Sequence, residues 1–160
     1  MHLTILSIGR MKRGPEQELF KTYLERANKT GPSLHLFGPK LIEFPEDRSS
    51  DSSERKSAEA NRILASAPAG AQMILLDETG KDCSSVEFSK LIAEKRDSGT
   101  SNLCFALGGP DGHGDEIRNA AMQSIRFGKQ TWPHQIARIL LAEQIYRAMT
   151  ILSGHPYHRA

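Results

Sequence analysis

Two continuous apolar runs constrain the fold of this chain more than any other feature. They are MILL at 73–76 and LCFAL at 103–107, and polar or glycine residues follow each of them. A strand with one face in water alternates apolar and polar residues, so continuous runs indicate strands buried on both faces. Amphipathic helical segments separate these strands from each other and from an N-terminal strand at 3–9. The alternation predicts an α/β fold with a mainly parallel sheet and helices on both faces.

The other elements follow from spacing, caps and breakers. A helix is expected over 14–29 with Leu19, Tyr23 and Ala27 on one stripe, and Ser85 marks the cap region of a helix that stops at Gly99. The remaining expectations are an extended segment around Gly38-Pro39, a Ser-rich surface loop at 48–57 running into a helix that ends near Ala67, a short helix at 115–123, a short strand at 124–128 and a long helix at 133–152. Because no repeat or linker is apparent, residues 1–160 are predicted to form one domain.

The helix at 133–152 is apolar on most sides. Ile139, Ala142, Tyr146 and Met149 form one stripe, and Leu141, Ile145, Ala148 and Leu152 form another. Such a helix must be buried on most sides. One stripe can face the sheet and the other a second subunit, which predicts a homodimer, and a core helix wrapped within a monomer is the alternative. Glu143 and Arg147 have the i,i+4 spacing of an ion pair.

Composition excludes several classes of protein. The chain is 38% apolar and 25% charged, as globular proteins are. No apolar run approaches the roughly 20 residues of a membrane span, and no signal peptide is apparent. Cys104 lies inside an apolar run, which predicts a buried free thiol rather than a disulfide with Cys83. A cytoplasmic protein with no membrane association is expected.

Positive charge is concentrated in the C-terminal third. From Ile117 onward the chain has one acid, Glu143, so this part carries +5 and the rest −3, within a net charge of +2. The six cations are Arg118, Arg126, Lys129, Arg138, Arg147 and Arg159. They predict a surface for an anionic partner, and a solvated face is the alternative. A second cluster, Arg10, Lys12 and Arg13, would flank the glycine loops if the first strand lies beside the strand at 103–109.

Two glycine-bearing loops follow strands near the C-terminus. Residues 108–114 read GGPDGHG and residues 128–133 read GKQTWP, and neither is a P-loop or a GxGxxG motif. Loops at the carboxyl ends of neighbouring strands are where open α/β sheets bind small ligands. Here they can enclose a ligand of adenosine size, with Leu76 and Asp77 at the end of a third strand. Trp132 either stacks on that ligand or packs against the protein, and packing is its more common role.

The chain ends in a tail with varied side-chain chemistry. His155, Tyr157, His158 and Arg159 combine stacking surfaces with a guanidinium fork, which suits a nucleobase and a phosphate. The tail histidines could join His134 as metal ligands, but no Cys or carboxylate stands at ligand spacing beside them. No metal site is therefore predicted.

These motifs together resemble one family. The segments ILLDETGK, FALGGPDG, RILLAEQIYRA and HPYHR, with the loop that ends in Pro133-His134, are similar to the ribosomal RNA large-subunit methyltransferase H family of the SPOUT methyltransferases. The resemblance covers the whole chain, including its start, LTILSIGRMK. It implies an α/β domain with a C-terminal deep trefoil knot, and a homodimer whose site lies near the interface.

The resemblance also implies the chemistry. The expected reaction transfers a methyl group from S-adenosylmethionine to N3 of a pseudouridine in 23S rRNA of the assembled ribosome. The cofactor-binding residues carried over are Leu76, Gly109, Gly128, Lys129, Gln130, Thr131, Trp132 and Pro133. In catalysis, Arg159 or Arg147 would supply positive charge and Tyr157 would orient the base. His158 would accept the N3 proton.

Two other functions stay open at this point. An RNA-binding protein of the same fold that has lost catalysis would not need an intact pair of glycine loops. A nucleotide-binding hydrolase would need paired carboxylates or a metal cluster around those loops, which the sequence does not show. Cofactor binding and its sensitivity to Mg²⁺ separate the three hypotheses.

Overall fold

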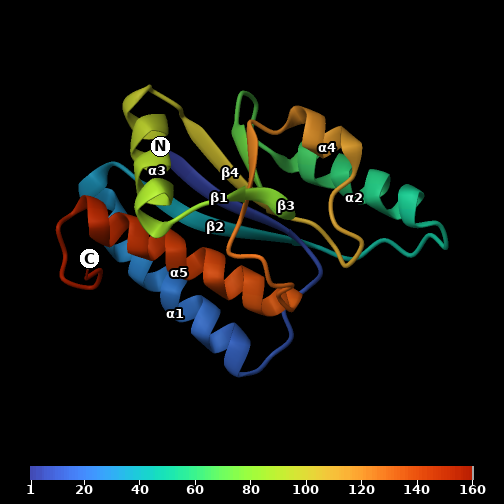
Figure 1. The fold of residues 1–160 in the computed structure, drawn as a ribbon, viewed down its shortest axis with the longest axis horizontal. Helices are drawn as coiled ribbons and strands as arrows, with labels where there is room; N and C mark the ends of the chain where they lie inside the picture. Colours follow the sequence, from blue (N-terminus) through green and yellow to red (C-terminus); the bar gives the residue numbers. More distant parts are fainter. Residues whose placement is uncertain (160) are drawn as a thin grey trace.

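A parallel sheet of five strands forms the centre of the computed structural model, which describes residues 1–159 (Figure 1). The strands are β1 (His2–Ile8), β2 (Phe37–Phe44), β3 (Gln72–Asp82), β4 (Asn102–Leu107) and β5 (Gln123–Arg126). Their order across the sheet is β2-β1-β4-β3-β5, and each neighbouring pair is parallel. The parallel sheet expected from the sequence is confirmed.

Helices cover both faces of this sheet. They are α1 (Pro15–Thr30), α2 (Ser52–Ser66), α3 (Ser85–Asp97), α4 (Asp115–Ala120) and α5 (His134–Leu152), and a 3-10 turn spans Gly31–Leu34. On one face α5 packs against α1 and α3, and on the opposite face α2 packs against α4 (Figure 1). The described chain therefore has the layered α/β architecture that the alternation of strands and helices predicts.

The central strands supply side chains to both layers. In β4, Leu103, Phe105 and Leu107 belong to the core beneath α1, α3 and α5, whereas Cys104 and Ala106 belong to the core beneath α2 and α4. All five are at most 3% exposed, which explains why this strand carries no polar residue after Asn102. Cys104 is a buried free thiol, as predicted, and burial raises its pKa to about 11.

The buried face of α1 differs from the expected stripe. Phe20 and Ala27 are its buried residues, while Leu19 is 46% exposed. Tyr23 is half-buried, and its ring lies 6.3 Å from that of Tyr146 on α5. Ala27 and Tyr23 thus lie on the face that packs against the core, as predicted, and only the first member differs, with Phe20 in place of Leu19.

Two helix starts also differ from the sequence expectation. Half of the Ser-rich segment is helical, because Asp51 caps α2 by accepting a hydrogen bond from the backbone N–H of Glu54. On α3 the cap is Ser84 rather than Ser85. Its side chain and that of Glu87 form a reciprocal capping box.

Both apolar stripes of α5 are covered within a single chain. The residues that are at most 8% exposed are Ile139, Leu141, Ala142, Ile145, Tyr146, Ala148 and Met149. Within one chain α1, α3 and the sheet thus bury most of both stripes, while Leu152 is only partly buried, and the homodimer stays a prediction. The expected Glu143–Arg147 ion pair is present at 2.5 Å. Within residues 1–159, no helix is both long and apolar enough to cross a membrane.

The C-terminal part of β3 pairs with β5 at two points that are separated by a bulge. The strand continues to Asp82, beyond its expected end, and Ile125 of β5 is in register with both Leu76 and Lys81. Residues 77–80 bulge outward between these two pairings. A Cβ on Gly80 would lie 2.6–2.8 Å from backbone atoms of Ile125, so only glycine permits this approach of two backbones.

Candidate functional site

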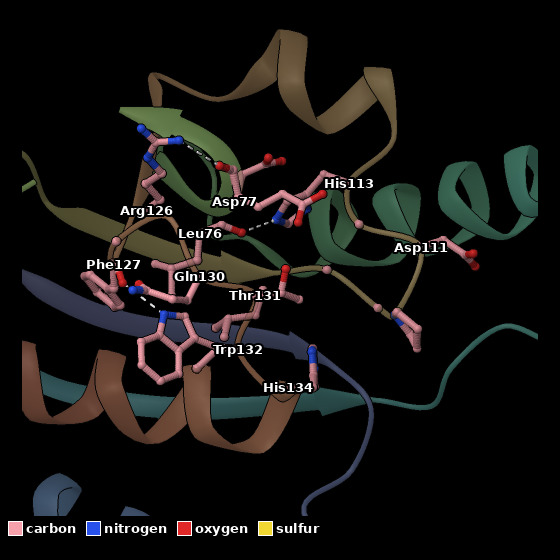
Figure 2. A pocket seen from close by; sticks show the side chains of 18 of the residues that line it. Leu76, Asp77, Asp111, His113, Arg126, Phe127, Gln130, Thr131, Trp132 and His134 are labelled. Carbon is pink, nitrogen blue, oxygen red and sulfur yellow. Dashed lines mark hydrogen bonds between the residues drawn. The ribbon is translucent and has the colours of Figure 1, made fainter. Parts of the chain in front are cut away.

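A cavity of about 400 Å³ opens at the carboxyl edge of the sheet, between the ends of β3, β4 and β5 and the start of α5 (Figure 2). Its wall comes from residues 76–78, 107–113, 126–128 and 130–132, with Arg118 of α4 and the first turn of α5. The two glycine loops and the third strand end thus meet where the sequence predicted a ligand site. The volume lies in the range of sites for small molecules and cofactors.

Most of the predicted cofactor ligands line this cavity. They are Leu76, Gly109, Gly128, Gln130, Thr131 and Trp132. Lys129 and Pro133 belong to the same loop but not to the wall; Lys129 is exposed, and Pro133 is the N-cap residue of α5. The grouping agrees with the predicted site, while binding itself stays a prediction.

Trp132 does not have the packing role that the sequence favoured. Its side chain is 42% exposed, and its Nε1–H donates to the carbonyl of Phe127 at 2.9 Å (Figure 2). This bond closes the loop at 127–132 on itself and holds the indole ring at the cavity wall. The ring is therefore placed where it can contact a bound ligand.

The first glycine loop needs its glycines for close packing. A Cβ on Gly109 would lie 2.7 Å from Oε2 of Glu59 and 3.2 Å from Cγ2 of Ile8. A Cβ on Gly108 would lie 2.8 Å from the carbonyl oxygen of Gly112. The loop is thus pressed between α2 and β1 on its outer side, which leaves backbone rather than side chains on the cavity side.

His113 fastens this loop to the neighbouring strand. Its Nε2 lies 2.9 Å from the carbonyl oxygen of Leu76, and the residue is 5% exposed (Figure 2). Burial lowers the pKa of His113, although the bond to Leu76 opposes the shift. The imidazole is therefore held neutral and joins the ends of β3 and β4.

A carboxylate network stands beside His113. Oδ1 of Asp77 accepts hydrogen bonds from the N–H and the hydroxyl of Thr79, and its Oδ2 lies 2.7 Å from Nη2 of Arg118. Burial opposes ionisation of Asp77, but the bonds from Thr79 and the charge of Arg118 outweigh it and lower its pKa. Glu78 is exposed at the cavity wall. Glu78 is therefore the wall carboxylate that no described cation pairs with, since Asp77 is paired with Arg118 and Asp111 with Arg55.

The start of α5 is tied to the end of β1. His134 Nε2 lies 2.5 Å from the carbonyl oxygen of Ile8. Arg138, which is 1% exposed, donates to the carbonyl oxygens of Ile8 and Gly9 and pairs with Glu43 at 2.5 Å. These bonds set where α5 and the loop before it stand against the sheet.

Most of the C-terminal cations do not form the basic surface that the sequence predicted. Arg118 pairs with Asp77, Arg126 with Asp82, Arg138 with Glu43 and Arg147 with Glu143. Three of those acids come from earlier parts of the chain, so folding cancels a charge asymmetry that exists only along the sequence. This expectation is wrong for these four residues, whereas Lys129 and Arg159 are exposed.

The tail folds back onto α5. The Tyr157 hydroxyl donates to Glu143 at 3.0 Å, and its ring lies 4.8 Å from the ring of Tyr146. The Arg147 guanidinium stands over the Tyr157 ring at 4.8 Å, and its Nη1 lies 3.4 Å from Nδ1 of His158. Three of the four predicted catalytic residues therefore meet in one cluster.

This cluster lies away from the cavity of its own chain. His134 lines the cavity at the start of α5, and Arg147 lies 13 residues further along the same helix. At a rise of 1.5 Å per residue, the two are about 20 Å apart along the helix axis. Neither Arg147 nor the described tail belongs to the cavity wall. Partial burial, with hydrogen bonds to Tyr23 and Glu143, raises the pKa of Tyr157, so its hydroxyl stays protonated and donates. Arg159 follows in an exposed position.

Several site residues went unnoticed in the sequence. His113 belongs to the glycine loop GGPDGHG, and a single histidine in such a loop is a pattern from which a site residue could have been predicted. The sequence predicts Arg118 and Arg138 only as cations of a basic surface, and nothing in the polar sequence around Glu59 indicates that it is 5% exposed beneath Gly109. Within residues 1–159, no group of three His, Cys, Asp or Glu side chains could hold a metal ion.

Comparison with known proteins defines the class. A family model described as "Predicted SPOUT methyltransferase" matches residues 1–158, and the chain belongs to this family of methyltransferase enzymes. The protein named ribosomal RNA large subunit methyltransferase H of Chelativorans sp. (strain BNC1) is 52% identical over 159 residues, which are 99% of this chain and 91% of the relative. Proteins of the same name from Methylocella silvestris and Brucella anthropi are 50% identical over 159 residues and 49% identical over 160 residues, covering at least 99% of each chain. Within the SPOUT methyltransferases, the chain is a member of the ribosomal RNA large subunit methyltransferase H family.

Two histidines, the buried His113 and the half-buried His134, make stability dependent on pH. Burial lowers the pKa of both His113 and His134, so the unfolded chain binds protons near its ordinary pKa of about 6.5 while the folded chain does not. Acidification below that value therefore favours the unfolded state, by up to about 1.4 kcal/mol per pH unit for each histidine. We expect urea unfolding to show this loss between pH 7 and pH 5.5.

Matched variants isolate the two rings. His113→Gln and His134→Gln should each flatten the pH dependence, and His155→Gln, at an exposed position, should not. A dependence equally steep in all three variants would show that neither His113 nor His134 causes it.

Proposed function

We propose that this enzyme transfers a methyl group from S-adenosylmethionine to N3 of a pseudouridine in 23S rRNA, acting on the assembled ribosome. The single observation that carries the proposal is the cavity enclosed by the loops at 108–113 and 127–132 at the carboxyl edge of the sheet. It coincides with the donor site that the family resemblance implies. The names of the relatives support ribosomal RNA of the large subunit as the substrate.

The cavity fits a nucleoside donor with positive charge. Its volume suits an adenosine-sized group, and its glycine loop offers backbone N–H and C=O groups because no side chain stands at Gly108 and Gly109. The exposed carboxylate of Glu78 at the wall complements a sulfonium or an ammonium group. Leu76 and Trp132 supply apolar surface for a purine ring.

The residues of the chain then have separate tasks. Bound S-adenosylmethionine would supply an activated methyl group. The loops at 108–113 and 127–132 would hold the donor and orient its methyl group towards N3 of the base, which is mainly a positioning task. His158 would accept the proton that N3 loses.

The tail cluster refines the proposed catalytic roles. Arg147 is paired with Glu143, so Arg159 is the better source of positive charge for the imide anion that develops at the base. The Tyr157 hydroxyl is already bonded to Glu143, which leaves its ring edge and backbone to orient the base. Nδ1 of His158 lies 3.4 Å from Nη1 of Arg147, so this contact sets the position of the imidazole ring within the tail cluster.

The enzyme works as a homodimer in this proposal. What supports it is distance, because the tail cluster stands about 20 Å along α5 from the cavity of its own chain. A second copy can bring its tail to that cavity without unwinding either helix. The substrate also places the enzyme in the cytoplasm, where ribosomes are.

The chain is also knotted in this proposal, as in the SPOUT fold. The chain passes from α4 on one face of the sheet to α5 on the opposite face by way of β5. Ile125 of β5 pairs with both Leu76 and Lys81 of β3. This crossing from one face of the sheet to the other beside β3 supports the knot that the family resemblance implies.

Transfer of labelled methyl from S-adenosylmethionine tests the function. We expect label on ribosomes that lack the modification, located at a pseudouridine, and none on isolated 23S rRNA. Label on free RNA would keep the chemistry but reject the assembled substrate. Donor binding without label on either would favour an RNA-binding protein that has lost catalysis.

Tail variants in the same assay test the roles. His158→Ala should slow turnover and change its pH profile, and Arg159→Ala should lower turnover or ribosome affinity. An unchanged rate and pH profile in His158→Ala would remove the proton-acceptor role. Sensitivity of donor binding to Mg²⁺ would favour the hydrolase.

A further inference from the structure

We propose that the loop between β1 and α1, residues 10–13, is the surface that grips the phosphate backbone of the RNA substrate next to the donor cavity. This inference rests on the proposed function and goes beyond it, because neither the cavity nor the tail says where the RNA backbone is held. We call this segment the basic loop. Its sequence is Arg-Met-Lys-Arg.

Exposed cations distinguish the basic loop from the C-terminal third. Arg10, Lys12 and Arg13 are all exposed, and none of them is in an ion pair among the described residues. In contrast, four of the six C-terminal cations are neutralised by carboxylates. Phosphate binding releases counterions only where the protein charge is free to replace them. Of the two basic clusters that the sequence predicted, the one at the basic loop therefore keeps its charges unpaired among the described residues.

The backbone of the basic loop is held firmly from beneath. Met11, which lies between Arg10 and Lys12 in the sequence, is 7% exposed and packs in the hydrophobic core. Its backbone N–H donates to the carboxylate of Glu43 at 2.8 Å. The N–H of Gly9 donates to Phe44, and its carbonyl accepts from the buried Arg138. The three cations thus project from a fixed backbone, so little ordering entropy is lost when they meet phosphates.

The basic loop also stands beside the cavity. β1 pairs with β4, which is the condition under which the sequence predicts that this loop flanks the glycine loops. Gly9, just before the basic loop, lies close to His134 of the cavity wall, because an ideal Cβ on Gly9 would be 3.6 Å from the His134 ring. In Figure 2 the chain leaving β1, drawn in dark blue, runs past His134 at the edge of the site. A nucleotide whose base enters the cavity would leave its flanking phosphates within reach of this loop.

The nearby acids do not cancel these charges by pairing. Glu43 is occupied by Arg138 and the N–H of Met11. Glu16 and Glu18 belong to the first turn of α1, where they face the positive end of the helix dipole. Glu46 lies on the same side of Gly9 as His134, with its Oε1 3.3 Å from an ideal Cβ there, and it is in no ion pair with the three cations among the described residues.

Binding to ribosomes at several KCl concentrations tests the proposal. The variant Arg10→Gln/Lys12→Gln/Arg13→Gln should bind at least ten-fold more weakly at 0.1 M KCl. Its slope of log affinity against log salt should fall by about 2 to 3, since each phosphate contact contributes about 0.7–0.9. Thermal stability and affinity for S-adenosylmethionine should not change.

The matched control removes the same charge elsewhere. Lys29, Lys40 and Lys90 are exposed on α1, β2 and α3, and changing all three to Gln should leave the salt slope close to that of the parent. Equal losses in both variants, or an unchanged slope in the basic-loop variant, would overturn the proposal. If the parent methylates no ribosome, the proposed function fails instead, and the binding comparison still decides whether the loop grips RNA.

Discussion

Arg138→Met is expected to destabilise the protein by about 3–5 kcal/mol, the cost of breaking a buried ion pair by removing one partner. The guanidinium is 1% exposed and satisfies the carboxylate of Glu43 and the carbonyl oxygens of Ile8 and Gly9. Methionine fills the space but leaves these acceptors without their donor. For a chain of this length the melting temperature should fall by about 6–20 °C.

Arg96→Met is the control for this change. Arg96 pairs with Asp97 at the surface, where an ion pair contributes at most about 1 kcal/mol. Urea unfolding of both variants against the parent measures the difference. A loss below about 1 kcal/mol for Arg138→Met would show that the buried pair does not anchor α5. The same variant should also weaken ribosome binding, because Arg138 holds the backbone of the basic loop.

Gly80→Ala is expected to destabilise the protein by about 3 kcal/mol, at the upper end of the range for overpacking. The added Cβ would stand 2.6–2.8 Å from three backbone atoms of Ile125, and a backbone cannot move aside as a flexible side chain can. Relief requires β5 to separate from β3, and β5 leads directly into the loop at 127–132 of the cavity wall. Donor affinity should therefore fall together with stability.

Gly99→Ala is the matched glycine replacement. An added Cβ meets nothing within 4 Å there, and only the positive φ of +82° opposes alanine. We expect a cost of about 1 kcal/mol and no change in donor affinity. Thermal unfolding and donor titration of both variants decide the matter, and similar stability losses in the two would mean that β3 and β5 can part easily.

Local pattern was sufficient for much of the fold. The run at 103–107 predicted a strand buried on both faces, and β4 sends alternate side chains into the two cores. The glycine loops and Leu76 were expected at one edge because parallel strands bring their carboxyl ends together, and they do line one cavity. Spacing within one helix was also enough to predict the Glu143–Arg147 pair.

Local pattern failed where partners come from distant segments. Leu19 was chosen in place of Phe20 because α5 and β2, not helical spacing alone, choose the buried face of α1. Burial of most of both α5 stripes within one chain was only the alternative prediction, because the sequence does not say that α1 and α3 flank the helix. Trp132 was expected to pack, yet its loop closes on Phe127 and leaves the ring exposed.

The sequence by itself determined the order of strands and helices, the two-sided burial of the central strands and the grouping of glycine loops at one edge, because each depends on neighbouring residues or on a general property of parallel sheets. Only the tertiary structure decided which charges remain free. Asp77, Asp82 and Glu43 meet Arg118, Arg126 and Arg138 across long separations in the chain, and charges cancel by distance in space rather than in sequence. The tertiary structure also decided that the tail cluster lies away from the cavity, because the length of α5 separates them within one chain.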